Sequence, residues 1–280
     1  MGWIKKIKQD TNAAAQKIQP SPLSVSFDED IFNSKLQQLI LLTSRHGGLD
    51  FFIDVLKHKQ EIFFKILMPG AIDDLDRVNA EHLLMLVFPS RRVFAPLLAA
   101  TDFQKFAESL RHLLYAESPL DARILQFVRQ MEGQDRKVQR ATWDFAAECL
   151  HGTYPEQYPL MCRWVWHQGT HSGALREFIR GNDAMNTIEL GNDAGMFESV
   201  RLWFAQQLAA QGYRRDISQI TDLLLALAYA EYLLAMSSGM GMMGSEFGAK
   251  TQPMEIVVKL LGLDDRRPPS VTPVTDQQLH

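Results

Sequence analysis

The residues between Cys149 and His171 have the side chains that could support catalysis or metal binding. This stretch contains both cysteines of the chain and three of its eight histidines. Cysteine, histidine and carboxylate side chains are the usual protein ligands of zinc and iron, and cysteine beside histidine can act as a nucleophile. The candidate metal ligands in and next to the stretch are Asp144, Glu148, His151, Cys162, His167 and His171.

Asp144, Glu148 and His151 are spaced four and three residues apart, which places them on one face of a helix. Glu148-x-x-His151 has the spacing of helical di-iron sites, but no second motif of this kind occurs in the chain. Lys137 and Arg140 fall on the same face, a pattern typical of a solvated, salt-bridged helix surface. We therefore expect this face to be exposed, and a metal site is the alternative.

The remaining residues of the stretch give weaker metal signals. Cys149 and Cys162 lie much farther apart than the two to four residues that separate zinc-finger cysteines. The loop-like sequence around His167 and His171 argues against a helical ligand pair.

Two aromatic residues of the stretch are candidates for partner binding. We expect them to form a corner of the core that clamps two helices, with an exposed anchor for another protein as the alternative. These aromatic residues are Trp164 and Trp166.

Helical periodicity extends over nearly the whole chain, and no hairpin or strand pair is indicated. We therefore expect an all-α fold, an irregular multi-helix globular bundle of about ten helices with no significant β-sheet. A capping box at Ser26-Phe-Asp-Glu29 predicts the start of a helix that ends near Arg45. The other expected helices cover about 52–67, 78–88, 91–100, segments opening near 101 and 118, and then 135–151, 196–211, 216–237 and 254–261.

Proline-rich breaks divide the chain into three expected parts. Residues 1–20 form an amphipathic N-terminal segment, residues 21–265 a helical globular domain, and residues 266–280 a disordered tail rich in proline and threonine. A subdivision of the globular domain near 131–136 is left open, because a Gly-containing turn separates two helices there.

The most apolar segment is the expected helix at 216–237. Asp222 and Glu231 interrupt it well before the roughly 18 uninterrupted apolar residues of a membrane-spanning helix. We therefore predict a buried core helix and no membrane span. A buried carboxylate needs a partner, and arginines such as Arg201, Arg214 and Arg215 are the expected ones.

Composition restricts the function further. The net charge of −4 gives no overall basic surface, which argues against nucleic acid as a partner. Two cysteines in 280 residues suit a reducing cytoplasm, and the N-terminus lacks the apolar stretch of a secretory signal. No phosphate-binding loop, dinucleotide fingerprint, serine-hydrolase elbow or zinc-protease motif occurs, so we expect no cofactor.

These observations favour a non-enzymatic accessory or adaptor protein of bacterial type. It would act through contacts with other proteins, including further copies of itself, in a larger cytoplasmic assembly. The basic, amphipathic residues 2–17 would add at most weak peripheral membrane contact. The candidate partner-binding residues are apolar or flexible: Trp3, Ile4, Ile7, Trp164, Trp166, Met240, Met242 and Met243.

Two other functions remain open. The first is a metal-dependent helical enzyme, using zinc or iron, with its site around residues 144–171. The second is a nucleic-acid-binding helical module that uses the basic region 123–140. The residues that would bind phosphates in that module are Arg123, Arg129, Arg136, Lys137 and Arg140.

Overall fold

The computed structural model describes residues 17–93, 98–99, 102–130, 135–182, 187–239 and 252–264. Within these residues the chain forms nine α-helices and no strand, which confirms the expected all-α fold. The helices are α2 (Glu29–Ser44), α3 (Leu49–Leu67), α4 (Arg77–Met85), α6 (Phe103–Tyr115), α7 (Leu120–Arg129), α8 (Arg136–Thr153), α9 (Ala194–Ala210), α10 (Ile217–Gly239) and α11 (Pro253–Leu260). Short 3-10 helices lie at η2 (Ile72–Asp74), η3 (Ser90–Arg92), η4 (Gln168–Thr170) and η5 (Ala174–Phe178).

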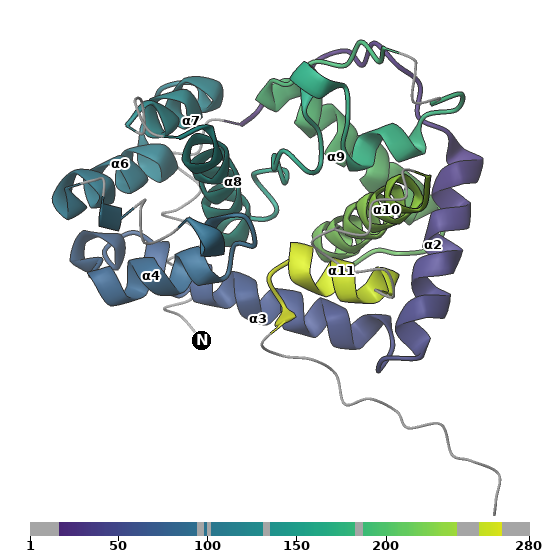
Figure 1. The fold of residues 1–280 in the computed structure, drawn as a ribbon, viewed down its shortest axis with the longest axis horizontal. Coiled ribbons are helices and arrows are strands. Elements are labelled where there is room, and N and C mark those ends of the chain that lie inside the picture. The colour runs from purple at the N-terminus through teal and green to yellow at the C-terminus, as the bar shows by residue number, and fades with distance from the viewer. Residues whose placement is uncertain are drawn as a thin grey trace, which may run out of the picture.

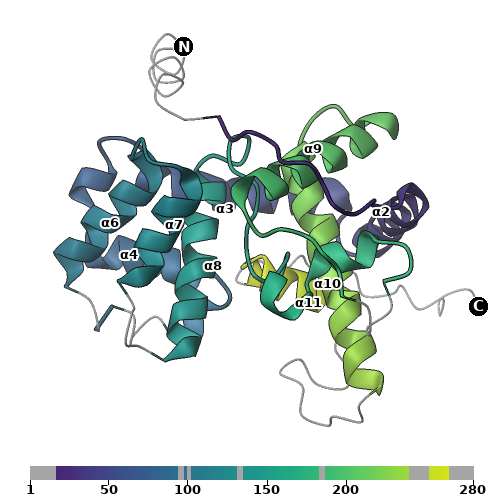
Figure 2. The ribbon, with the colours of Figure 1, turned by 90° about the horizontal axis from the view of Figure 1, so that it is seen from above.

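The helices gather in two groups, and α3 is long enough to reach both. Figure 1 shows α4, α6, α7 and α8 on one side, α2, α9, α10 and α11 on the other, and α3 along the base of both groups. Figure 2 shows the same division from above. In the first group α7 and α8 pack on each other and on α6, and in the second α10 packs on α2, α9, α11 and η5. Because α3 packs on α8 as well as on α2 and α10, it joins the two groups.

Several predictions of boundaries and segments fall on residues outside the described ranges. These include the N-terminal segment before Lys17, the tail after Asp264, and part of the proposed division near 131–136. Among the partner-binding candidates they include Trp3, Ile4, Ile7, Met240, Met242 and Met243. Of the expected helix at 91–100, residues 94–97 and 100 also lie outside, and its start is the 3-10 helix η3.

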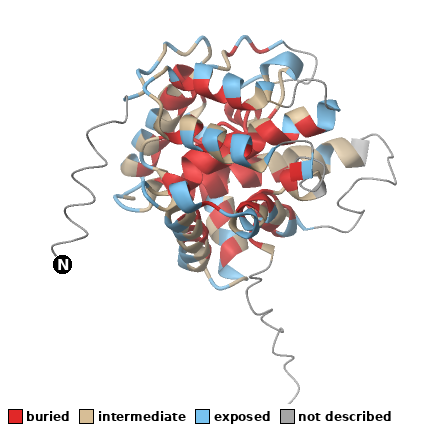
Figure 3. Ribbon diagram, turned by 90° about the vertical axis from the view of Figure 1, so that its left-hand side faces the viewer, coloured by how far each residue is buried: buried red, intermediate tan, exposed pale blue. Residues whose placement is uncertain are grey.

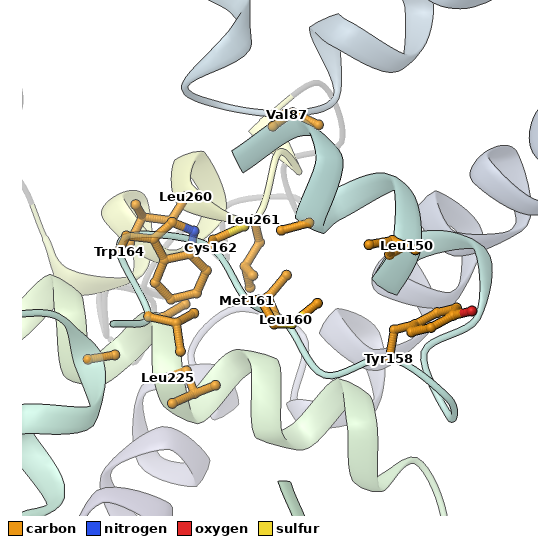
Figure 4. Close-up of a cluster of buried hydrophobic side chains, with 14 of the residues drawn as sticks. Val87, Leu150, Tyr158, Leu160, Met161, Cys162, Trp164, Leu225, Leu260 and Leu261 are labelled. Atoms are coloured by element: carbon orange, nitrogen blue, oxygen red, sulfur yellow. The ribbon is translucent and has the colours of Figure 1, made fainter. Parts of the chain in front are cut away.

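One continuous apolar cluster fills the inside of the molecule and extends through both groups of helices. Figure 3 shows the buried residues concentrated on the inward sides of the helices. In the close-up of Figure 4 the segment after α8 runs between helices and inserts its side chains among theirs. The labelled members of this part of the core are Val87, Leu150, Tyr158, Leu160, Met161, Cys162, Trp164, Leu225, Leu260 and Leu261.

The start of α2 differs from the predicted capping box at Ser26. Phe27 forms an isolated antiparallel bridge with Ile179, and the Asp28 N–H donates to the Phe178 carbonyl at 2.8 Å. The backbone is therefore held extended at these positions, and the helix begins afterwards. The Asp28 carboxylate is the cap, accepting from the N–H groups of Asp30 and Ile31 at 3.0 Å.

Helix α10 is the central helix of the second group. By length and composition alone its residues Ile217–Ser237 could cross a membrane, with a mean hydropathy of 1.4, and 56% of that stretch is buried within the fold. Its two carboxylates are paired, but the predicted arginine partners are wrong: Asp222 contacts His151 and Glu231 contacts Lys35. Packing against α2, α3, α9, α11 and η5 accounts for its apolar composition without a bilayer.

Candidate functional site

The carboxylate and histidine face of α8 is buried, so the expected solvated surface is wrong for this part of the helix. Asp144, Glu148 and His151 are 5%, 3% and 5% exposed. Lys137 and Arg140, nearer the start of α8, are exposed as predicted. The difference arises because α3, α10 and the segment after α8 contact these three side chains in the C-terminal half of the helix, whereas Arg136, Lys137 and Arg140 in its N-terminal half are exposed.

Glu148 forms a buried ion pair with Lys59 of α3. The Lys59 Nζ donates to Glu148 Oε2 and to the Leu261 carbonyl, both at 2.8 Å, and lies 5.7 Å from the centre of the Phe63 ring. Lys59 is on the same helical stripe as Leu56 and Phe63, so the apolar packing of α3 forces its charge inside. The pair thereby ties α3, α8 and the end of α11 together.

His151 pairs with Asp222 of α10. Its Nε2 lies 2.8 Å from Asp222 Oδ2, and its Nδ1 lies 2.8 Å from the Tyr158 carbonyl oxygen. Burial alone would lower the pKa of His151, but the Asp222 charge and hydrogen bond outweigh it and the net pKa is raised. Both ring nitrogens contact oxygen atoms inside the fold, so neither is free to reach a substrate.

Asp144 and the two cysteines have environments that favour their neutral forms. Burial raises the pKa of Asp144 to about 7, although its Oδ1 accepts from the Arg163 N–H at 2.7 Å. Burial also raises the pKa of both thiols well above their usual value. Cys149 and Cys162 are free and fully buried, so they behave as small apolar side chains and not as thiolate nucleophiles.

The raised pKa of Asp144 leads to a prediction about stability and pH. Because the folded state binds this proton more tightly than the unfolded state, stability from this group is present below pH 3.8 and is lost as pH rises to about 7. Asp144→Asn keeps an acceptor oxygen for the Arg163 N–H but cannot ionise. We expect the melting temperature of the variant, relative to the parent protein, to rise over that pH window and then level off.

The measurement is a series of paired thermal melts of the two proteins between roughly pH 4 and pH 9. Subtracting one melting temperature from the other at each pH cancels the contributions of the other titrating groups. A difference that stays constant across the series would show that Asp144 ionises in the fold as easily as in the unfolded chain.

Both candidate tryptophans belong to the core. Trp164 is 6% exposed and Trp166 is 1% exposed, which confirms the expected aromatic corner. Trp164 lies against Tyr229 of α10, with ring centres 6.0 Å apart. Gly173 allows this corner to close, because its φ is +133° and a Cβ there would lie 2.5 Å from the Val165 carbonyl oxygen. Both side chains are therefore part of the core of this fold and are not presented on its surface.

The six candidate metal ligands are not brought together. His171 Nδ1 contacts the Ile188 carbonyl, and His167 lies in the half-exposed turn around η4, while the others form the separate buried contacts described above. Among the described residues no group of three or more histidine, cysteine or carboxylate side chains is arranged to hold a metal ion.

The structure instead assembles a pocket at the open, N-terminal half of α8. It has a volume of about 430 Å³ and opens to solvent. We call it the cationic pocket, and its lining consists of Val128, Arg136, Gln139, Arg140, Trp143, Arg163, His167 and Asn192. The α8 members are spaced three and four residues apart and so share one face, while Arg163 and His167 come from the segment that follows α8.

The cationic pocket has an excess of positive charge. Among the described residues no carboxylate lines it, and Arg136 and Arg140 form no ion pair with any of those residues. Partial burial lowers the pKa of His167, and the charges of Arg163 and Arg140 lower it further. Burial and the Arg140 charge likewise lower the pKa of Arg163, against the opposing effect of Asp144. These shifts indicate a site at positive potential.

His167 orients Arg163 within this pocket. The Arg163 Nη2 lies 3.1 Å from His167 Nε2, and His167 Nδ1 lies 2.8 Å from Thr170 Oγ1. A neutral imidazole that accepts from the arginine at Nε2 carries its proton at Nδ1 and donates it to Thr170. The guanidinium group is thus held in place by a partner that adds no negative charge to the pocket.

Sequence reasoning identified only part of this pocket. Arg136, Arg140 and His167 were candidates, but for different functions, and Arg123 of the basic region is buried, donating to the Leu113 and Leu114 carbonyls. The spacing of Trp143 from Arg136 and Arg140 on one helical face was the signal that could have extended the set. Nothing in the sequence places Arg163 beside them.

No family model, no curated protein and no solved structure matches this chain.

Proposed function

We propose that this protein is a non-enzymatic helical accessory or adaptor protein, and that it binds an anionic group of its partner in the cationic pocket. The single observation that carries the proposal is a solvent-open pocket to which the described part of the chain contributes three arginines and no carboxylate. Arginine forms short, charge-assisted hydrogen bonds to carboxylates and phosphates, and arginine is enriched in protein interfaces. A reducing compartment such as the cytoplasm suits its two free, buried cysteines.

The environment of the buried polar groups supports a binding role over catalysis. A general base needs a lone pair within reach of a substrate, and a nucleophile needs a lowered pKa or an adjacent base. His151 uses both ring nitrogens internally, Glu148 is paired with Lys59, and the two thiols have raised pKa values. These groups therefore hold helices together.

The partner-binding proposal is tested with two double variants that change net charge equally. Arg136→Glu/Arg140→Glu reverses the charge of two arginines that line the pocket. Lys105→Glu/Lys137→Glu reverses the charge of two exposed lysines outside its lining. We expect affinity purification from the native host to recover a partner with the parent protein and with the Lys105/Lys137 control. The amount of partner recovered with the pocket variant should be lower by a factor of about ten or more. Equal recovery with both double variants would refute the role of the pocket.

The metal-enzyme alternative is tested by metal analysis of the purified protein. Stoichiometric zinc or iron that disappears in the Glu148→Gln, His151→Gln or Cys162→Ala variants would overturn the non-enzymatic proposal. The nucleic-acid alternative predicts salt-sensitive binding of DNA or RNA that the pocket variant weakens more than its control.

A further inference from the structure

The cationic pocket combines two features that a simple anion site does not require. Three arginines provide the charge, and Trp143, an aromatic residue of the lining, lies on the same face of α8 as Arg136 and Arg140. The Trp143 Nε1 donates to the Met161 carbonyl at 3.0 Å, so the indole is fixed in orientation while remaining half-exposed. Among the described residues no other ring and no cation is stacked on it.

The size of the pocket limits what it can hold. A volume of about 430 Å³ lies in the range typical of small-molecule sites. A partly exposed tryptophan beside arginines is a combination on which nucleobases can stack and phosphates can be bound. A nucleic-acid strand would need a longer cationic track, but Arg123 of the neighbouring helix α7 is buried and donates to the Leu113 and Leu114 carbonyl groups.

We propose that the cationic pocket binds a nucleoside monophosphate. In this arrangement the phosphate contacts the guanidinium groups of Arg140 and Arg163, with Arg136 at the rim, and the base lies against Trp143. The hydrogen bond from Arg163 to His167 fixes the orientation of the Arg163 guanidinium group before the ligand binds, which reduces the conformational entropy lost on binding. The inference deepens the proposed function, on which it rests, by making the anionic group a nucleotide that accompanies or controls partner binding.

A phosphorylated side chain of a partner protein would present the same phosphate to the same arginines. It would not need an aromatic plane, since arginine clusters alone recognise phosphoserine. The contribution of the base is therefore the property that distinguishes the two ligands, and the titration must measure it separately from the contribution of the phosphate.

The experiment is isothermal titration of the full-length protein with adenosine and guanosine monophosphates, adenosine, inorganic phosphate, a phosphoserine peptide and a short single-stranded oligonucleotide. We expect at least one nucleotide to bind about tenfold or more tightly than adenosine and than inorganic phosphate, because the base and the phosphate each contribute. Arg140→Glu and Trp143→Leu should each weaken that binding about tenfold or more, whereas Lys137→Glu should change it less than about twofold.

Three results would overturn the inference. These are nucleotide binding no tighter than that of inorganic phosphate, tighter binding of the phosphopeptide or the oligonucleotide, and equal loss in Arg140→Glu and Lys137→Glu. Thermal melts of each variant show whether it is folded, and Arg140→Glu, at an exposed position, keeps the test valid if Trp143→Leu does not fold. Absence of nucleotide binding together with partner loss in the pocket double variant would remove this inference but leave the proposed function standing.

Discussion

Replacing Lys59 by methionine is expected to lower the free energy of unfolding by about 3–5 kcal/mol, because it leaves Glu148 charged and buried without a cation. The two side chains are only 7% and 4% exposed, so water cannot take over the role of the missing ammonium group. The substitution also removes the donor to the Leu261 carbonyl, which loosens the end of α11. Urea denaturation followed by circular dichroism measures the change in free energy.

The matched control is the double variant Lys59→Met/Glu148→Leu. Replacing both members of a buried pair by apolar residues of similar volume is often close to neutral, so the double variant should recover most of the lost stability. A single variant as stable as the parent protein would mean that Glu148 reaches solvent or another cation. A double variant less stable than the single one would mean that the pair itself does not determine the effect.

Trp164→Ala is expected to destabilise the fold by roughly 3–5 kcal/mol, since removing a large buried aromatic side chain leaves a cavity. Trp164 belongs to the segment after α8 and packs against α10, where it contacts Tyr229. The closer replacement Trp164→Phe should cost much less, because it keeps a ring in the site and the indole Nε1 has no hydrogen-bond partner among the described residues.

Thermal and chemical denaturation of the two Trp164 variants would check this prediction. A melting temperature of Trp164→Ala equal to that of the parent protein would contradict the buried aromatic corner. It would return Trp164 to its alternative role as an exposed anchor for another protein.

The positions of the helices were determined largely by the sequence itself. The helical pattern of apolar residues predicted a helix at 135–151 and another at 216–237, and the structure has α8 at Arg136–Thr153 and α10 at Ile217–Gly239. Such signals are local: they depend on residues within three or four positions of each other and on the hydrogen bonding at helix ends. Ser26 was the exception, since the bridge between Phe27 and Ile179 moves the start of α2 to the next residues.

The environment of each polar group was decided only by the tertiary structure. Periodicity correctly placed Asp144, Glu148 and His151 on one face of α8, but it could not show that α3 and the segment after α8 cover that face. Their ion-pair partners are distant in sequence: Lys59 lies 89 residues from Glu148, and Asp222 lies 71 residues from His151. The cationic pocket likewise combines α8 with residues from two later segments. Helix spacing fixes which side chains share a face, whereas packing between distant helices decides which faces are buried and which charges meet.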